Sequence, residues 1–367
     1  MKNILTTLGA LALTTTAGFS GGIDRSGQGN GALFEKGDYT EFSFGSVAPN
    51  VSGVDVAAFG GGPSGNVAAN YLQFGMSVKT DLSENLSAAL ILDQPFGADV
   101  LYGAGSIALG GTRAVAKSTA LTGLLRYKFN NGFSAFGGLR LQKSSAQVDL
   151  RGAAYGPFNG YSVDLKSDTS TGYSVGVAYE KPEIALRVAL TYNSAITHEF
   201  ATLETVRGAP VSAVATSVDT PQSINLDFQS GVAKNTLVFG SIRWAEWSKF
   251  KLDPAFFTPR AGGGLIDLEN STTYTLGVGR KFSDTWSGAV SVSYEGKGDP
   301  LVSPLAPTNG RLGITLAGIY STGNIKITTG VNYTKLGDAN PETSDTARAD
   351  FTGNSALGIG VKFAYSF

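Results

Sequence analysis

Large apolar residues alternate with small or polar residues along most of this chain. In residues 286–294, Trp286, Val290, Val292 and Tyr294 fall on one face of an extended chain, whereas serines and an alanine fall on the other. Segments 121–129, 173–179, 312–320 and 325–333 repeat the arrangement. A period of two residues is the signature of a β-strand with one apolar face. The pattern therefore predicts an all-β protein whose strands have chemically different faces.

Fourteen segments carry this alternation. They lie near residues 39–48, 70–80, 85–93, 118–129, 132–145, 170–180, 183–196, 221–232, 235–246, 272–282, 285–296, 309–321, 324–334 and 355–367. Strand boundaries predicted in this way are good to a few residues.

The connections between these segments alternate strictly in length. Six are short turns, at 81–84, 130–131, 181–182, 233–234, 283–284 and 322–323. Seven are long, at 49–69, 94–117, 146–169, 197–220, 247–271, 297–308 and 335–354. A soluble β-sandwich has no reason to alternate its loops so regularly, whereas a transmembrane barrel has short turns at one end and long loops at the other. We therefore expect a 14-stranded antiparallel transmembrane β-barrel, closed by its first and last strands.

Composition and aromatic placement indicate the bacterial outer membrane. Charged residues make up 16% of the chain and glycine is abundant at 49 residues. Aromatic residues lie beside the short turns and predict a girdle at the inner membrane boundary: Tyr127, Phe129, Tyr179, Phe282, Trp286, Phe363, Tyr365 and Phe367. Because β-strands are enriched in aromatic residues anyway, the prediction of a girdle rests on the clustering of these residues beside the short turns. The last strand, ending on Phe367, is expected to engage the barrel-assembly machinery.

The N-terminus is typical of a secretory signal peptide. Lys2 precedes a short apolar run at residues 4–13, and Thr15 and Ala17 suit the −3 and −1 cleavage positions. An ordinary first helix is the alternative, because the run is too short to span a bilayer. We divide the chain into a signal peptide (1–17), a short N-terminal hatch (18–38) and the barrel (39–367).

Several kinds of chemistry are not expected. The net charge of −1 offers no basic stripe for nucleic acid. The absence of cysteine excludes zinc–thiolate sites, and the single histidine, His198, excludes a two-histidine metal site. A Ser–His–Asp enzyme stays formally possible, but a structural role for His198 is favoured. We expect no enzyme activity, no cofactor and no metal.

Three stretches resemble the FadL family of outer-membrane transporters for long-chain fatty acids and hydrocarbons. They are TGYSVGVAYEKPEIALRVALTYNSAITHEF at 171–200, TPQSINLDFQSGVAKNTLVFGSIRWAEWSKF at 220–250 and FSFGSVAPNVSG at 42–53. The Trp-x-x-Trp-Ser motif that begins at Trp244 is the most specific feature. The resemblance covers the mature chain and implies a 14-stranded barrel with a hatch in its lumen. The family's Asn-Pro-Ala motif is absent, so segment 18–36 predicts a shortened hatch.

The resemblance also implies a sideways exit at a kinked third strand. The third strand here ends in Asp93, Gln94, Pro95, Phe96 and Gly97. Proline cannot donate to a ladder and glycine weakens one, so a local break is physically reasonable. The alternative is that these residues are simply the end of the strand and the start of a loop.

Candidate ligand-binding residues come from the hatch and the long loops. Apolar hatch and loop residues could hold a hydrophobic ligand, namely Phe19, Ile23, Leu33, Phe34, Phe96, Leu101, Tyr102, Phe256 and Phe257. Inward-facing arginines could hold a carboxylate head group, namely Arg126, Arg140, Arg187 and Arg243. The alternative for each arginine is a salt bridge with a lumen or hatch carboxylate such as Asp24, Glu35 or Asp38. Inward placement is favoured because a cation on the lipid face at mid-membrane costs roughly 2–4 kcal/mol.

The expected function is passive uptake of hydrophobic small molecules, fatty acids or hydrocarbons, through an apolar pocket and a lateral wall opening. A water-filled porin for polar solutes and a structural or adhesive barrel are the alternatives. Expected partners are the ligand, outer-membrane lipid and lipopolysaccharide, and the barrel is expected to be a monomer.

Overall fold

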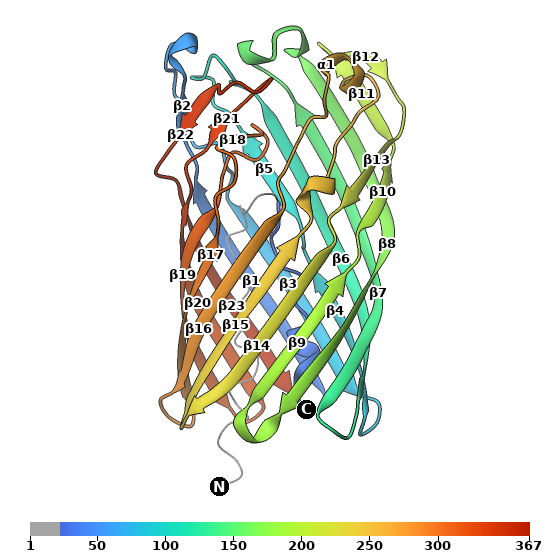
Figure 1. Cartoon of the computed structure of the whole chain (residues 1–367), viewed down its shortest axis with the longest axis vertical. Coiled ribbons are helices and arrows are strands. Elements are labelled where there is room, and N and C mark those ends of the chain that lie inside the picture. The colour runs from blue at the N-terminus through green and yellow to red at the C-terminus, as the bar shows by residue number, and fades with distance from the viewer. Residues whose placement is uncertain (1–22) are drawn as a thin grey trace.

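The computed structural model describes residues 23–367, and the predicted signal peptide lies outside them. Fourteen long strands form the wall of a barrel, each antiparallel to its neighbours (Figure 1). They are β1 (Tyr39–Asn50), β3 (Tyr71–Asp81), β4 (Leu86–Asp93), β6 (Arg113–Lys128), β7 (Phe133–Asp149), β8 (Tyr161–Lys181), β9 (Leu186–Asn193), β14 (Ser223–Ala233), β15 (Thr236–Ala245), β16 (Ser271–Lys281), β17 (Trp286–Glu295), β19 (Arg311–Thr322), β20 (Ile325–Leu336) and β23 (Ser355–Ser366).

The first and last strands close the wall. β1 pairs with β23 from Tyr39 opposite Ser366 to Asn50 opposite Ser355. Closure removes the free edges that an open sheet would expose to lipid, where backbone groups find no water to bond. The predicted strand number and closure are confirmed. No helix among the described residues is long and apolar enough to cross a bilayer.

The outward face of the wall is apolar. Leucines, valines and isoleucines alternate outward along the strands, and Leu139 is 67% exposed. Predicted girdle residues such as Trp286 and Phe282 are exposed beside the short turns. A second set of exposed tyrosines, including Tyr274 and Tyr294, lies near the other end of the strands. These two aromatic levels bound the band that faces lipid.

Some residues predicted as loop are strand. β6, β7 and β8 extend to Arg113, Asp149 and Tyr161, well into the predicted loops 94–117 and 146–169. The alternation rule missed them because these extensions rise above the lipid band, where most of their outward residues, such as Lys117 and Lys143, are polar. The long loops also contain short strands, namely β2 (Gly53–Asp55), β5 (Gly97–Leu101), β10 (Ile196–Phe200), β11 (Thr202–Val206), β12 (Ala209–Ser212), β13 (Thr216–Thr220), β18 (Leu301–Val302), β21 (Asn340–Pro341) and β22 (Ala349–Phe351).

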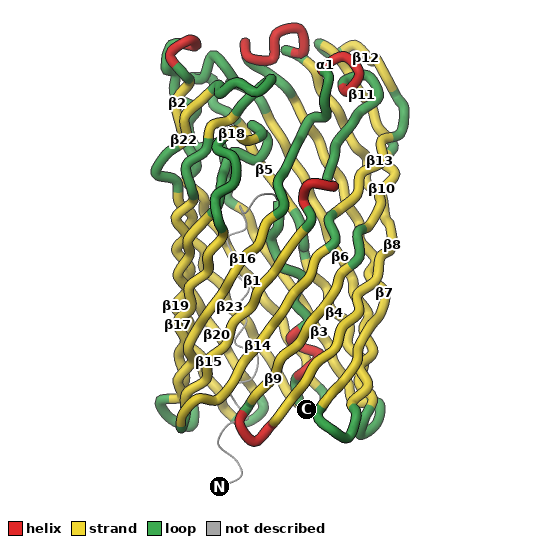
Figure 2. Tube along the Cα trace, in the orientation of Figure 1, coloured by secondary structure: helices red, strands yellow, loops and turns green. Residues whose placement is uncertain are grey.

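Helical turns are few and short. Figure 2 shows them among the long loops, at one short turn and inside the barrel. They are η1 (Gly31–Phe34), η2 (Ala57–Phe59), η3 (Ala153–Phe158), η4 (Pro182–Ile184), η5 (Trp247–Lys249) and α1 (Thr258–Ala261). η1 belongs to the predicted hatch, and its Leu33 and Phe34 are buried against wall residues that include Leu124 and Phe136.

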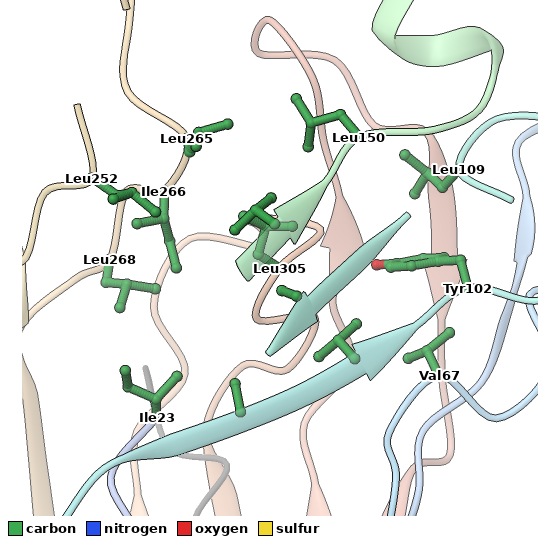
Figure 3. Packing of buried hydrophobic residues seen from close by; sticks show 14 of the residues in the cluster. Ile23, Val67, Tyr102, Leu109, Leu150, Leu252, Leu265, Ile266, Leu268 and Leu305 are labelled. Atoms are coloured by element: carbon green, nitrogen blue, oxygen red, sulfur yellow. The ribbon is translucent and has the colours of Figure 1, made fainter. Parts of the chain in front are cut away.

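The long loops pack together over one end of the barrel. Their buried side chains form one cluster, here called the loop core, which includes Trp247 and Phe351. Figure 3 shows part of this cluster, with Tyr102, Leu109 and Leu150 among the labelled residues. Burial raises the pKa of the Tyr102 phenol well above its usual range, so this hydroxyl stays neutral and donates to the Pro304 carbonyl at 2.9 Å. Satisfied polar groups and dense apolar contacts make the loop core a packed layer.

Candidate functional site

The wall is interrupted at its third strand. β4 ends at Asp93 and β5 begins at Gly97, and both pair with β6. β3 pairs with β4 from Met76 onward, but residues 71–75 of β3 have ladder partners only in β1. The Gln94 side chain partly replaces the missing ladder, because its Oε1 accepts a hydrogen bond from the Phe74 amide at 3.0 Å. The break falls within the segment 93–97 that the sequence singled out.

Residues 23–26, the first described part of the predicted hatch (here still called the hatch), bond to this break. Asp24 and Phe96 form an isolated antiparallel bridge. The Gly97 amide donates to the Ile23 carbonyl at 2.8 Å, and the Arg25 amide donates to the Pro95 carbonyl at 2.7 Å. Three hatch residues therefore occupy backbone groups that a continuous strand would have offered to its neighbour.

Arg25 passes directly over a glycine in the break. Its Nε donates to the Gly97 carbonyl at 2.9 Å, and its guanidinium carbon lies 4.0 Å from the centre of the Tyr71 ring. A Cβ on residue 97 would come within 2.6 Å of that guanidinium carbon. Only glycine therefore lets Arg25 reach this position, where it stacks as a cation on an aromatic face.

One ion pair, and one hydrogen bond to a wall ion pair, anchor residues 24 and 26 of the hatch to the wall. Asp24 accepts from Arg243 Nε at 2.6 Å, and both side chains are 11% exposed. Ser26 Oγ donates to Asp93 Oδ2 at 2.5 Å, while Arg140 Nη2 donates to both Asp93 oxygens at 2.9 and 3.1 Å. Charge-assisted hydrogen bonds of this kind are stronger than neutral ones.

An apolar cavity of about 50 Å³ lies between the hatch, the break and the loop core. Aromatic rings gather beside it, since Trp247 packs edge-on against Phe96 at 5.4 Å and Phe250 at 5.9 Å between ring centres. Its lining combines apolar and hydroxyl side chains with one lysine: Ile23, Phe96, Ala116, Lys117, Ser118, Ser144, Ser145, Ala146, Leu165, Phe200, Val218, Thr220, Phe250 and Leu252. We call it the apolar pocket.

A second cavity, of about 330 Å³, lies at the break itself. Its lining includes Arg25, Tyr71, Leu72, Gln94 and Asp99. We call it the wall gap. It shares Phe96, Ala116, Lys117 and Ser118 with the apolar pocket, so these residues form the partition between the two cavities.

Phe96 is held in this partition by one hydroxyl. Ser118 Oγ receives a hydrogen bond from the Phe96 amide and donates one to the Phe96 carbonyl, both at 2.8 Å. The Phe96 side chain is only 4% exposed. One buried ring on a non-ladder segment thus separates the apolar pocket from the wall gap.

Three of the four predicted head-group arginines are bound to carboxylates. Arg126 pairs with Glu180, Arg140 with Asp93 and Arg243 with Asp24. These pairs favour the salt-bridge alternative. Arg187 makes no ion pair with any described residue; it lies 4.8 Å from the Phe34 ring centre and lines a lumen cavity of about 140 Å³ together with Asp227.

His198 is fully buried in a polar network at the outer end of the wall. Its Nδ1 lies 2.8 Å from Asp168 Oδ2, and its Nε2 lies 3.2 Å from Gln142 Nε2 and 3.4 Å from Ser144 Oγ. Buried polar groups need such partners. The nearer Gln142 amide donates to Nε2, so both ring nitrogens of His198 have hydrogen-bond partners and the ring is held in one orientation. This arrangement is in keeping with a structural role.

The predicted ligand residues separate into several groups. Ile23 and Phe96 line the apolar pocket. Leu33 and Phe34 pack lower in the barrel, and Tyr102 and Phe257 are buried in the loop core. Leu101 is 51% exposed, Phe256 packs under the Arg260 guanidinium, and Phe19 lies outside the described residues.

Sequence reasoning missed most of the pocket. Phe200, Val218, Phe250 and Leu252 lie in loops or short loop strands, and no periodicity connects them. A signal was present in the Trp-x-x-Trp-Ser motif, because its second tryptophan, Trp247, precedes Phe250 and supports the pocket rings.

Comparison with known proteins agrees with this architecture. A family model described as "Outer membrane protein transport protein (OMPP1/FadL/TodX)" matches residues 45–302. A FadL homologue of Pseudomonas aeruginosa is similar in structure, with a TM-score of 0.71, 14% identity and 92% of each chain covered. A toluene transporter TodX of P. putida has a TM-score of 0.63 at 13% identity, covering 92% of this chain and 94% of its own.

The toluene transporter TbuX of Ralstonia pickettii has a TM-score of 0.61 at 11% identity, covering 92% of this chain and 91% of its own. At such identities the structural likeness shows the fold alone. A search of curated proteins gives no significant match.

Proposed function

Because this chain belongs to the outer membrane protein transport family (OMPP1/FadL/TodX) and forms its 14-stranded outer-membrane barrel, we propose that it takes up small, uncharged hydrophobic molecules through the apolar pocket and the wall gap. The observation that carries the proposal is that a single aromatic ring separates the two cavities. Of the aromatic residues that line the apolar pocket or the wall gap, Phe96 is the one that lines both. Transfer of apolar surface from water into the pocket supplies the driving force, about 25 cal/mol per Å² buried.

The charges around the pathway favour an uncharged ligand. Arg126, Arg140 and Arg243 are each occupied by a carboxylate. Among the described residues, the one charged side chain that lines the apolar pocket is Lys117, which is exposed on the outside of the wall. A carboxylate buried in this pocket would lose its hydration and gain few partners, which is costly. Toluene-like hydrocarbons avoid that cost.

The size of the pocket implies a moving part. An apolar cavity of about 150 Å³ holds one benzene molecule. The apolar pocket, at about 50 Å³, is much smaller. A ligand must therefore displace lining residues. Phe96, in the break, and Ile23, in the hatch segment bonded to it, suit this role because neither belongs to the continuous ladder of the wall. Their displacement would also join the pocket to the wall gap.

The porin alternative is less well supported. A porin needs a continuous water-filled path, whereas the loop core covers the outer end and the hatch fills part of the lumen. A lumen cavity of about 140 Å³ does lie beside the hatch, lined by polar and charged residues together with Phe34, Phe228 and Phe239. Passage of small polar solutes would require that the hatch leave the barrel.

Cells of a transporter-deficient host expressing this protein provide the test, with radiolabelled toluene, oleate and a disaccharide compared at equal barrel abundance. We expect toluene uptake several-fold above vector cells, a smaller gain for oleate and none for the disaccharide. Disaccharide uptake, or large steady currents in planar bilayers, would contradict the proposal. Oleate uptake that exceeds toluene uptake and is lost in Arg187→Gln would transfer the assignment to carboxylate ligands. Arg187 lines the lumen cavity and is attracted by Glu180, Glu35 and Asp227, but among the described residues it forms no salt bridge.

A further inference from the structure

Three lysines gather on the outside of the wall, on adjacent strands β6, β7 and β8. Lys117, Lys143 and Lys166 are all exposed. Lys117 and Lys143 continue the outward-facing series of Leu121 and Leu141, because the side chains of a strand alternate with a period of two. They therefore point away from the lumen.

The strand register brings these lysines together. Lys117 lies opposite Ser145, and Lys143 lies opposite Thr119 on one side and Thr169 on the other. The β7–β8 register shifts between Ser144 and Ala146, which places Lys166 beside Ser145 on the other flank. With neighbouring strands about 4.8 Å apart, all three side chains can reach a single anionic group.

Their height on the wall matches a membrane surface. Leu121 and Leu141 lie opposite each other and are exposed, so they mark lipid-facing wall. Lys143 is the next outward residue above Leu141, and Lys117 is the second above Leu121. At about 3.3 Å per residue on tilted strands, the lysines begin roughly 5–10 Å above the last outward leucines. Lipid phosphate groups occupy that level.

The neighbouring charges leave two of these ammonium groups available. Lys166 pairs with the exposed Asp164. Lys117 and Lys143 make no ion pair with any residue that the structure describes, and the nearby Asp168 faces inward to His198. On the adjacent β10–β13 hairpin, the exposed charged residues are Glu199 and Asp219, both acidic. The attraction for anions is therefore confined to β6–β8.

We propose that Lys117, Lys143 and Lys166 bind a phosphate group of lipid A, the membrane anchor of lipopolysaccharide, with its acyl chains lying over Leu121, Leu139 and Leu141. Ammonium groups bind phosphate as point charges, and exposed leucines provide the apolar surface that a free phosphate ion would not need. Because Lys117 also lines the wall gap, the bound lipid borders that opening. This site rests on residence in the outer membrane and not on the proposed ligand.

Binding of purified lipid A to the detergent-solubilised full barrel tests this site, with native mass spectrometry as the readout. We expect the triple variant Lys117→Gln/Lys143→Gln/Lys166→Gln to lose at least about tenfold in affinity, given the attraction typical of each basic residue at a lipid surface. A matched control removes the same charge from exposed lysines elsewhere, Lys249→Gln/Lys297→Gln/Lys335→Gln, and should bind as the unmodified protein does. Replacement of the three lysines of the site by arginine should retain binding.

Further ligands separate phosphate recognition from other binding. Lipid A stripped of its phosphates should bind weakly. Inorganic phosphate should compete poorly because it has no acyl chains, and phosphatidylglycerol because its phosphodiester carries a single charge where the phosphate monoester of lipid A carries up to two. Three results would each overturn the proposal: lipid A binding to the triple variant as tightly as to the unmodified protein, dephosphorylated lipid A binding as tightly as lipid A, or full competition by phosphatidylglycerol. Heat-modifiable migration on gels confirms that every variant is folded.

Discussion

The wall of this barrel has a continuous half and an interrupted region, and they satisfy their backbones differently. β19 and β20 pair without a break from Arg311 opposite Leu336 to Thr322 opposite Ile325. β3 and β4 pair only from Met76 opposite Leu92 to Asp81. In the continuous half, the backbone N–H and C=O groups of each strand are hydrogen-bonded to the neighbouring strands. In the interrupted region, the hatch and the Gln94 side chain replace the ladder, so these contacts can be exchanged without unfolding the wall.

The largest contrast should come from proline. Val290 of β17 lies opposite Val278 and Leu316, in the continuous half. Val290→Pro removes a ladder hydrogen bond where no edge exists, and we expect loss of folded barrel in a heat-modifiability assay.

Pro95 supplies the control for this prediction, because it lies in the break and contributes only its carbonyl. Pro95→Ala keeps that carbonyl and should fold in nearly normal yield. Equal loss of folded barrel in both variants would mean that the two regions do not differ as described.

Removal of one hatch anchor should have the next largest effect. Asp24→Asn leaves Arg243 buried without its carboxylate, and breaking a buried pair of this kind costs about 3–5 kcal/mol. We expect a loosened hatch, seen as frequent current openings in planar bilayers.

The control for the hatch anchor is Glu41→Gln, which weakens the Glu41–Lys362 pair between the adjacent wall strands β1 and β23. This variant should show no increase in current openings, because no hatch residue takes part in that pair. Quiet Asp24→Asn channels would show that this ion pair does not retain the hatch.

Removal of the Phe96 ring should alter transport more than folding. Phe96→Ala joins the apolar pocket to the wall gap, so we expect a several-fold gain in hydrocarbon uptake and a shift toward larger substrates. A buried aromatic of the loop core, Phe351, supplies the matched variant. Phe351→Ala also loses about 3–5 kcal/mol of packing but should show no such shift. An unchanged substrate range in Phe96→Ala would exclude the ring as the partition.

The smallest effect concerns one amide. Gln94→Ala removes the acceptor for the Phe74 N–H, a bond worth about 1 kcal/mol. Hydrogen exchange at the Phe74 amide should accelerate by roughly five- to tenfold, while the amide of Val278 in the continuous half should not change. Unaltered exchange at Phe74 would mean that this side chain does not substitute for the ladder.

Much of this fold could be predicted from the sequence, because a lipid-facing wall imposes a strict period of two. Strand number, closure and girdle aromatics such as Trp286 follow from that single constraint. The upper parts of β6–β8 could not be predicted. Below Lys143 the outward residues Leu141 and Leu139 face lipid and must be apolar, but above the membrane nothing imposes that requirement. The break at 93–97 was visible because proline and glycine act locally.

The apolar pocket was far less predictable. Phe200, Phe250 and Leu252 meet Ile23 only after the barrel has closed, and no local pattern records such contacts. The arginines show the same limit: alternation placed Arg243 inward, but its partner Asp24 lies 219 residues away in the sequence. Local periodicity fixes the direction of a side chain and not the identity of its partner.

The bonding of the hatch has a consequence for the order of assembly. Residues 23–26 precede every strand, yet their partners are Asp93 and Gly97 near the first third of the chain and Arg243 far beyond it. Contacts of such high sequence separation form late, because the chain between them must first be brought together. A segment that lies ahead of every described strand in the sequence is therefore among the last to be placed. A barrel halted before β15 forms would lack Arg243, so Asp24 would have no ion-pair partner and the hatch would be held only by its contacts with the break.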